Sequence, residues 1–288
     1  MKIIDSICYR INRLFRQRKV ANTFVSVTAL PRSKWLEGRC AIITGGTGGI
    51  GYAIAEAFLN SGCSVIITGR DQARIDKTLS KLNSGNAFGF VMDNTNVSSF
   101  GDSIDKILQH IHPRGIEHID ILVNNAGING HTMPNVDELE YDRIVDTNLK
   151  GVFFLSQYFG KYFVDNKIHG NILNIASASS LRPANSPYIV SKWGIRGLTL
   201  GLAKALGQYG ITVNGIAPGP TATPMMIKEG QTNMALDRIP LGRYIMPEEI
   251  ANMAVILVSD MGRSIMGDIV YMTGGAGILT YDDVNYGF

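Results

Sequence analysis

The stretch Cys40-Ala-Ile-Ile-Thr44-Gly45-Gly46-Thr47-Gly48-Gly49-Ile50-Gly51 joins a short apolar run to a glycine-rich turn, and a segment with helical periodicity follows it. A dinucleotide pyrophosphate needs a tight turn, a backbone that it can approach closely and a helix N-terminus that points at it. Glycine provides the first two because it has no Cβ, and the N–H groups and dipole of the helix provide the third. We therefore predict a dinucleotide-binding turn, although such a turn can also be only a flexible loop. The residues expected to contact the cofactor are Thr44, Gly45, Thr47, Gly49, Ile50 and Gly51.

Outward from this stretch, short apolar runs alternate with longer segments that have helical periodicity. The short runs are rich in Val and Ile and predict strands at 40–44, 64–68, 87–92, 119–123, 171–175, 211–216 and 268–272. Between them lie segments long enough for crossover helices, such as 50–59, 73–82, 100–110 and 248–257. This alternation predicts an α/β fold of the Rossmann type, a doubly wound parallel sheet of about seven strands with helices on both faces.

The length and the charge distribution suggest one domain behind a basic arm. A chain of 288 residues suits a single α/β domain, predicted over 39–288, preceded by an N-terminal arm and connector over 1–38. Residues 1–39 hold nine basic and two acidic residues, whereas the remainder holds eighteen basic and twenty-two acidic residues. The body of the chain is therefore slightly acidic, which argues against a nucleic-acid-binding function.

The cysteines and the apolar runs indicate a cytoplasmic protein. Cys8, Cys40 and Cys63 are scattered and odd in number, which fits free thiols in a reducing compartment. Every apolar run is too short for a membrane span, and the N-terminus lacks the continuous apolar region of a signal peptide.

The first residues predict an amphipathic helix whose role stays open. Its apolar residues fall on one face and its arginines outside that face. The apolar residues are Ile3, Ile4, Ile7, Ile11, Leu14 and Phe15, and the arginines are Arg10, Arg13 and Arg16. Such a helix can lie on an anionic membrane surface, which would make the protein peripheral to the membrane. It can equally pack on its own domain or on a neighbouring subunit.

Tyr188-Ile-Val-Ser-Lys192 places a tyrosine and a lysine one helical turn apart. Residues at i and i+4 share one helix face, about 6 Å apart along the axis. A free tyrosine titrates near pH ~10, so it is a reluctant acid and a worse base at neutral pH. A nearby ammonium ion stabilises the phenolate and makes proton transfer easier. The pair alone is equally compatible with an ordinary surface tyrosine and lysine.

Further motifs occur in a fixed order around this pair. They are Asn124-Asn125-Ala126-Gly127, Asp146-Thr-Asn148-Leu-Lys-Gly151, a strand that ends shortly before Ser177, and Pro218-Gly219-Pro-Thr-Ala-Thr223. Together with the T-G-x-x-x-G-x-G spacing of the first turn, they cover roughly residues 39–277. In this arrangement the chain resembles the short-chain dehydrogenase/reductase family, in its single-domain branch typified by 3-oxoacyl-acyl-carrier-protein reductases.

The resemblance implies a role for each matching residue. It assigns Ser177 to the substrate carbonyl, Tyr188 to proton transfer with Lys192, and Asn148 to a water in the proton relay. It places Asn125, Ala126 and Gly127 along the cofactor cleft and Asp93 at the adenine ring. Pro218, Gly219 and Thr223 then belong to the nicotinamide side of the cofactor.

The function implied is hydride transfer between a nicotinamide dinucleotide and a carbonyl or secondary alcohol group, with Tyr188 as general acid/base. The alternative is a dinucleotide-binding regulator or scaffold with the same fold and little catalysis. The presence of Asn148, Ser177, Tyr188 and Lys192 favours the enzyme. The histidines and carboxylates show no metal-ligand spacing, so no metal is expected.

The end of the second strand favours NADP(H) over NAD(H), although NAD(H) use stays possible. Gly69 occupies the position where NAD-preferring relatives keep an aspartate, and Arg70 is suited to pairing with a 2′-phosphate. Asp71 could supply the acid, but we expect it to cap the helix that begins at Gln72.

Two further segments concern partners. Residues 151–164 are apolar on nearly every side, which predicts a homodimer or homotetramer, with a bulkier buried environment as the alternative. Residues 223–234 include Met225 and Met226 and are expected to form a lid over an adaptable, partly apolar pocket for a small carbonyl or alcohol substrate. His131 is interpreted as solvent-exposed, although it could border that pocket.

Overall fold

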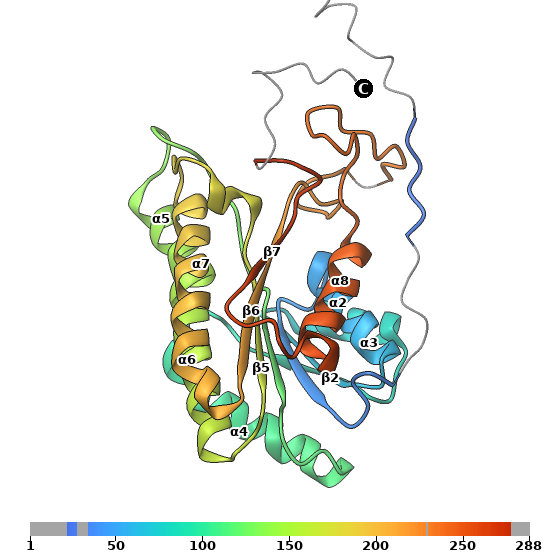
Figure 1. Cartoon of the computed structure of the whole chain (residues 1–288), viewed down its shortest axis with the longest axis vertical. Helices are drawn as coiled ribbons and strands as arrows, with labels where there is room; N and C mark the ends of the chain where they lie inside the picture. The colour runs from blue at the N-terminus through green and yellow to red at the C-terminus, as the bar shows by residue number, and fades with distance from the viewer. Residues whose placement is uncertain (1–21, 28–33, 229, 278–288) are drawn as a thin grey trace, which may run out of the picture.

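The computed structural model describes residues 22–27, 34–228 and 230–277. Within these ranges the strands form one seven-stranded parallel sheet of order β3-β2-β1-β4-β5-β6-β7 (Figure 1). The strands are β1 (Cys40–Thr44), β2 (Ser64–Gly69), β3 (Ala87–Val91), β4 (Ile121–Asn124), β5 (Asn171–Ile175), β6 (Thr212–Pro218) and β7 (Ile269–Met272). The predicted Rossmann-type α/β fold is confirmed.

Helices cover both faces of the sheet (Figure 1). They are α2 (Gly49–Asn60), α3 (Gln72–Leu82), α4 (Phe100–Ile111), α5 (Glu138–Val145), α6 (Gly151–Asp165), α7 (Pro187–Leu206) and α8 (Pro247–Val258). The side chains of α2, α3 and α8 pack in one apolar cluster and those of α4, α6 and α7 in another. Alternate residues of β1 serve the two clusters, Ile43 the first and Ile42 the second, as the pleat of a strand requires.

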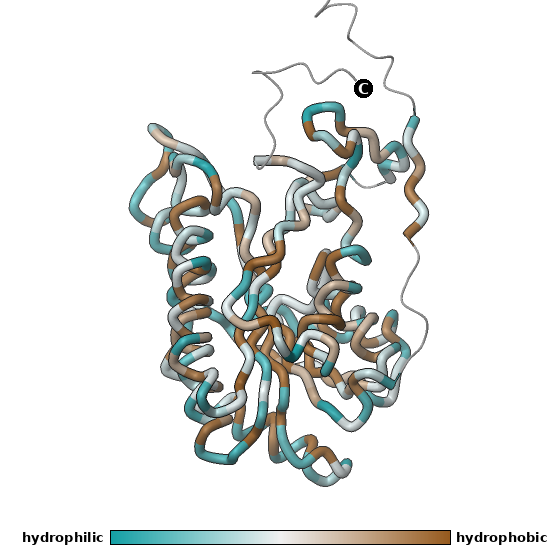
Figure 2. Tube along the Cα trace, viewed as in Figure 1, coloured by the Kyte–Doolittle hydropathy of each residue, from teal (hydrophilic) through white to brown (hydrophobic). Residues whose placement is uncertain are grey.

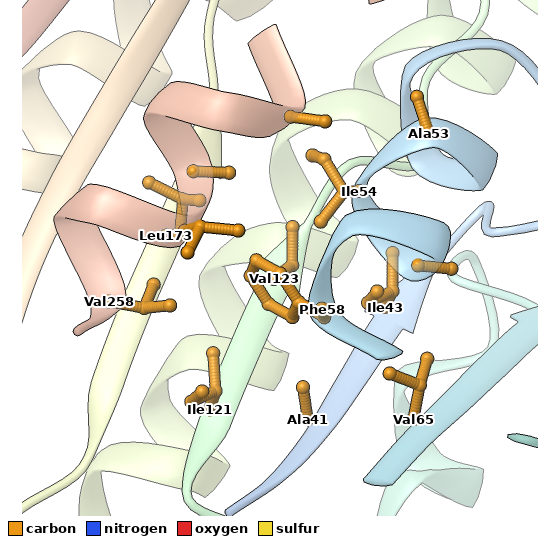
Figure 3. Close-up of a cluster of buried hydrophobic side chains, with 14 of the residues drawn as sticks. Ala41, Ile43, Ala53, Ile54, Phe58, Val65, Ile121, Val123, Leu173 and Val258 are labelled. Carbon is orange, nitrogen blue, oxygen red and sulfur yellow. The ribbon is translucent and has the colours of Figure 1, made fainter. Parts of the chain in front are cut away.

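The strands of the sheet are mainly apolar, whereas the exposed loops are more polar (Figure 2). In the first cluster the ring of Phe58 lies against Val123, between α2 and the sheet (Figure 3). Phe58 is fully buried, and burial of such a side chain contributes about 3 kcal/mol. This packing fixes α2 on β1 and therefore fixes the turn that joins them.

Several strand bounds differ from the predicted ones, most clearly in β6. This strand continues to Pro218, because Pro218 still lies beside Met272 of β7. Strand β4 begins at Ile121 and not at 119, and here the carboxylate of Asp120 accepts a hydrogen bond from the N–H of Cys40 at 2.8 Å. Both differences depend on neighbouring strands, which local composition does not report.

An extended segment, residues 22–27, lies against the loop that follows β6 (Figure 1). The N–H of Thr23 donates to Oδ1 of Asn233 at 2.9 Å, and the N–H of Met234 donates to the carbonyl of Thr23 at 2.9 Å. We call residues 22–27 the strap. The predicted amphipathic helix of residues 1–21 lies outside the described residues. In the described part of the chain, no helix has the length and apolar character needed to cross a bilayer.

Candidate active site

The glycine-rich turn has the backbone geometry that a pyrophosphate requires. Gly45 and Gly49 adopt positive φ angles of 63° and 54°. A Cβ on Gly51 would lie 2.5 Å from Nδ2 of Asn125 and 2.6 Å from the carbonyl oxygen of Gly45. No side chain caps α2, so its first N–H groups face the cavity described below. The turn therefore fits a dinucleotide, because helix dipole and unshielded backbone converge on one point.

The segment after β4 holds this turn in place. The N–H groups of Asn125 and Ala126 each donate to Oγ1 of Thr44 at 3.1 Å. The side chain of Asn125 returns two hydrogen bonds, to the carbonyls of Thr44 at 2.9 Å and Gly45 at 3.1 Å. These residues were predicted to line the cleft, and the structure shows that they also fix the shape of its floor.

One cavity of about 1750 Å³ opens at the carboxyl ends of the strands. It lies where the strand order reverses beside β1, which is where open α/β sheets bind ligands. Of the predicted site residues, it is lined by Gly45, Thr47, Gly49, Ile50, Arg70, Asp93, Asn125, Ala126, Gly127, Ser177, Tyr188, Lys192, Pro218, Gly219 and Thr223. The three that do not line it, Thr44, Gly51 and Asn148, lie directly behind its wall.

Tyr188 stands at the start of α7, where the chain returns from β5. Ser186 caps this helix by accepting from the N–H of Ile189 at 3.3 Å, and Pro187 occupies its first position. Burial raises the pKa of the Tyr188 phenol, and a hydrogen bond with Ser177 acts in the opposite direction with smaller effect. Ser177 and Tyr188, each predicted as a site residue, therefore lie close to each other.

Lys192 is buried one turn further along α7. Its Nζ atom donates to the carbonyl of Ile175 at 2.8 Å and lies 5.6 Å from the centroid of the Tyr188 ring. Burial lowers the pKa of this lysine to about 8. The ammonium group is thus anchored to the last residue of β5, a contact that the sequence did not reveal.

Asn148 lies in a π-helical turn, Asp146–Lys150, between α5 and α6. Its Oδ1 accepts from the N–H of Ile128 at 2.8 Å, and its Nδ2 donates to the carbonyl of Ile128 at 2.9 Å and to Oγ of Ser191 at 3.3 Å. Asn148 therefore joins the loop after β4 to α7. Single π-turns are frequent at functional sites, and no feature of the sequence predicted this one.

The far end of the cavity, beside β2, is strongly basic. Arg70 is exposed there, and Asp71 caps α3 as predicted, accepting from the N–H of Arg74 at 3.1 Å. Three cations of α3 line the same end, namely Arg74, Lys77 and Lys81. Sequence reasoning missed these three, although their spacing places them on one helix face. Asp93 uses Oδ1 to accept from the N–H and hydroxyl of Thr95, both at 2.9 Å.

Residues outside the cavity include His131, for which the sequence left two positions open. His131 is exposed and pairs with Glu140 at 3.1 Å, in agreement with its interpretation as a surface residue. Among the described residues, no group of three or more His, Cys, Asp or Glu could hold a metal ion. The loop after β6 is anchored by a two-fold contact, in which Arg243 donates to both carboxylate oxygens of Glu249 at 2.8 and 2.9 Å.

Fold and cleft together define a dinucleotide-dependent oxidoreductase of the parallel α/β class. Residues 39–234 match the family model of short chain dehydrogenases. The chain belongs to the short-chain dehydrogenase/reductase family, in the branch of the 3-oxoacyl-acyl-carrier-protein reductases, and acts on CH–OH or C=O groups. Its cofactor is a nicotinamide dinucleotide. Enzymes of this family act on small molecules and commonly form oligomers.

The names of the similar curated proteins indicate different substrates. The chain is 33% identical to a 3-oxoacyl-[acyl-carrier-protein] reductase of Thermotoga maritima, over 83% of this chain and 98% of that protein. It is 35% identical to a 3alpha-hydroxysteroid dehydrogenase of Mediterraneibacter gnavus, over 84% and 98% of the two chains. Among solved structures, a 3-ketoacyl-(acyl-carrier-protein) reductase of Brucella melitensis complexed with NADH superposes with a TM-score of 0.76 at 30% identity, over 84% and 100%.

Proposed function

We propose that the protein transfers a hydride between NADP(H) and a carbonyl or secondary alcohol group, with Tyr188 as the general acid/base. The observation that carries this proposal is that Ser177, Tyr188 and the buried Lys192 line the same cavity as the glycine-rich turn. A proton donor and a hydrogen-bond donor for one carbonyl oxygen therefore lie side by side.

The residues that would hold the cofactor fall into three groups along the cleft. The turn from Thr44 to Gly51 would take the pyrophosphate, Asp93 and Asn125–Gly127 the adenine side and floor, and Pro218, Gly219 and Thr223 the nicotinamide side. When bound, the nicotinamide ring supplies or accepts the hydride.

In the reductive direction, Oγ of Ser177 donates a hydrogen bond to the substrate carbonyl and Oη of Tyr188 gives up its proton to the developing alkoxide. Burial raises the pKa of Tyr188, so the phenol is protonated at neutral pH but is a weak acid, and its proton transfer needs the phenolate to be stabilised. Lys192, with a pKa of about 8, is mainly cationic at neutral pH and stabilises the phenolate that remains. Asn148 holds the loop and helix that frame the proton path.

A preference for NADP(H) is supported by charge and by space. A phosphate monoester carries close to two negative charges at neutral pH, and Arg70 with Arg74, Lys77 and Lys81 would surround it. A Cβ at Gly69 would lie 3.0 Å from Cγ2 of Thr47, so the aspartate typical of NAD-dependent relatives would crowd the turn. Asp71 is committed to capping α3.

We also propose a homodimer or homotetramer that uses α6. One side of α6 is buried on the sheet, yet Phe153 and Phe154 remain 45% and 40% exposed on the other. Two adjacent exposed phenylalanines favour a protein partner, for which a second copy of α6 is the simplest candidate.

Cys40 and Cys63 are free, buried thiols, which supports a reducing compartment such as the cytoplasm. Within the chain, 39–288 would form the catalytic domain and 1–38 its arm.

The proposal is tested with a panel of ketones, β-ketoacyl thioesters and hydroxysteroids, followed by NADPH absorbance. Tyr188→Phe should lower turnover about a hundred- to ten-thousand-fold while NADPH binding stays within about twofold. Wild-type turnover by the variant would refute the role of Tyr188. NADPH binding without turnover of any substrate would favour the dinucleotide-binding regulator instead.

A further inference from the structure

The cleft is basic although the body of the protein is acidic. Its described lining holds eight lysine and arginine side chains and two carboxylates. Both carboxylates, Asp71 and Asp93, already accept hydrogen bonds from backbone N–H groups. A cleft lined by one sign of charge concentrates ligands of the opposite sign.

The cofactor accounts for only part of this charge. Arg70, Arg74, Lys77 and Lys81 lie at the β2 end, and Lys192 is buried beneath Tyr188. The other three cations, Arg182, Lys228 and Arg238, line the cavity at the substrate end. Strands β2 and β5 are separated by β1 and β4, which amounts to three strand spacings or about 14 Å. The phosphates of a cofactor bound at the glycine-rich turn and beside β2 would therefore lie too far away to neutralise Arg182, Lys228 and Arg238.

Arg182 lies in the loop between Ser177 and Tyr188. Its N–H donates to the carbonyl of Ser179 at 3.2 Å, and its own carbonyl accepts from Nε1 of Trp193 at 2.8 Å. The backbone of Arg182 is thus fixed on both sides. Its side chain is exposed and reaches the segment after β7, where a Cβ on Gly277 would lie 3.6 Å from its Nε.

Arg238 also lines the cavity, and the turn that carries it contacts the same segment. It lies in a closed turn in which the N–H of Leu236 donates to the carbonyl of Gly242 at 2.8 Å. The N–H of Leu241 fixes this turn to the carbonyl of Gly274 at 3.0 Å. Buried Ile239, next in sequence, holds the turn on the body of the protein. Two arginines whose backbone is held by hydrogen bonds therefore line the cavity, and Arg182 lies beside the chain after β7.

We propose that the substrate carries an anionic group, carboxylate or phosphate, besides its reacting carbonyl, and that Arg182 and Arg238 bind this group. Among the described residues, no carboxylate lines the substrate end to compete for them. The planar guanidinium group pairs with carboxylate and phosphate through two parallel hydrogen bonds. Lys228 of the lid adds a third charge without fixed geometry. This inference rests on the proposed function, because it concerns the same substrate.

The test uses matched pairs of β-keto substrates that differ in charge. Acetoacetate is compared with acetoacetamide for a carboxylate, and acetoacetyl-4′-phosphopantetheine with acetoacetyl-pantetheine for phosphate. We expect kcat/KM with NADPH to favour the charged member of at least one pair by about tenfold or more. The pair that shows the effect identifies the anion. In Arg182→Gln/Arg238→Gln the ratio should fall towards one, while kcat/KM for the neutral member changes less than about twofold.

Arg196→Gln is the matched control, because Arg196 lies on α7 over the Trp193 ring and does not line the cavity. Its charge preference should equal that of the wild type. Binding of the same pairs to the Tyr188→Phe–NADPH complex is measured by calorimetry, so the result does not depend on turnover. Equal binding and equal kcat/KM within both pairs would overturn the inference. Loss of turnover with charge-selective binding intact would count against the proposed function alone.

Discussion

Nζ of Lys192 lies 2.8 Å from the carbonyl oxygen of Ile175, the last residue of β5. Strand β5, which leads to Ser177, therefore also holds Lys192 in place. Helix α7 carries both Lys192 and Tyr188, so it positions Tyr188 near Ser177. The three side chains proposed to be catalytic are in this way all positioned by the end of β5. This arrangement buries the ammonium group of Lys192, and burial lowers its pKa to about 8.

Lys192→Met should remove a pH dependence of stability. The folded-state pKa of about 8 lies below the value near 10.4 of an unfolded chain, so the unfolded state binds more protons between these pH values. Wild-type stability should therefore rise by about 3 kcal/mol from pH ~7.5 to pH ~10.5, relative to Lys192→Met. Urea unfolding of both proteins across this range measures the difference. Lys204→Met, an exposed lysine of the same helix, should keep the wild-type slope. Parallel curves for wild type and Lys192→Met would contradict the burial effect.

Arg70→Gln should raise the KM for NADPH about tenfold or more and change the KM for NADH less than about twofold, because only NADPH carries the 2′-phosphate. Arg74→Gln should act in the same direction with smaller effect. Lys106→Gln, an exposed cation of α4 outside the cleft, is the control and should leave both constants unchanged. If the wild-type KM for NADH is equal to or lower than that for NADPH, the proposed preference for NADP(H) is wrong.

Gly51→Ala should weaken dinucleotide binding and lower the melting temperature. The new Cβ would collide with Asn125 and with the carbonyl of Gly45, so the turn must open. Gly201→Ala is the matched helical control, since a Cβ there meets nothing within 4 Å and should stabilise α7 by about 0.5–1 kcal/mol. Thermal unfolding and NADPH fluorescence titration distinguish the two variants. A Gly51→Ala protein that binds NADPH normally would disprove the close approach.

Asn233→Ala should loosen the lid that we expect at residues 223–234, because Oδ1 of Asn233 accepts from the N–H groups of Thr23 and Ala235 at 2.9 and 3.1 Å. Limited trypsin digestion should then cleave after Lys228 or Arg238 several-fold faster, as proteolysis follows local opening. Asn233→Asp keeps the acceptor oxygen and should restore the wild-type rate. Unchanged cleavage in Asn233→Ala would show that the strap does not restrain the lid.

The sheet and the glycine-rich turn could be predicted because their signals are local. Val- and Ile-rich runs mark most of the strands, and Gly45, Gly49 and Gly51 mark the turn by themselves. Other features depend on contacts between distant segments. The bond from Lys192 to Ile175, the approach of α3 cations to the cleft and the contact of the strap with Asn233 need the folded chain. The π-turn at Asn148 escaped prediction because its residues have ordinary helical composition.

The π-turn at Asp146–Lys150 also determines the orientation of helix α6. One extra residue in a helical turn rotates everything beyond it by about 100°. The insertion at Asp146–Lys150 that aims Asn148 at Ile128 therefore also decides which side of α6 carries Phe153 and Phe154. Deleting a single residue there would displace Asn148 and would turn both rings away from the outer surface. The proposed proton path and the proposed α6 interface therefore depend on the same turn of the backbone.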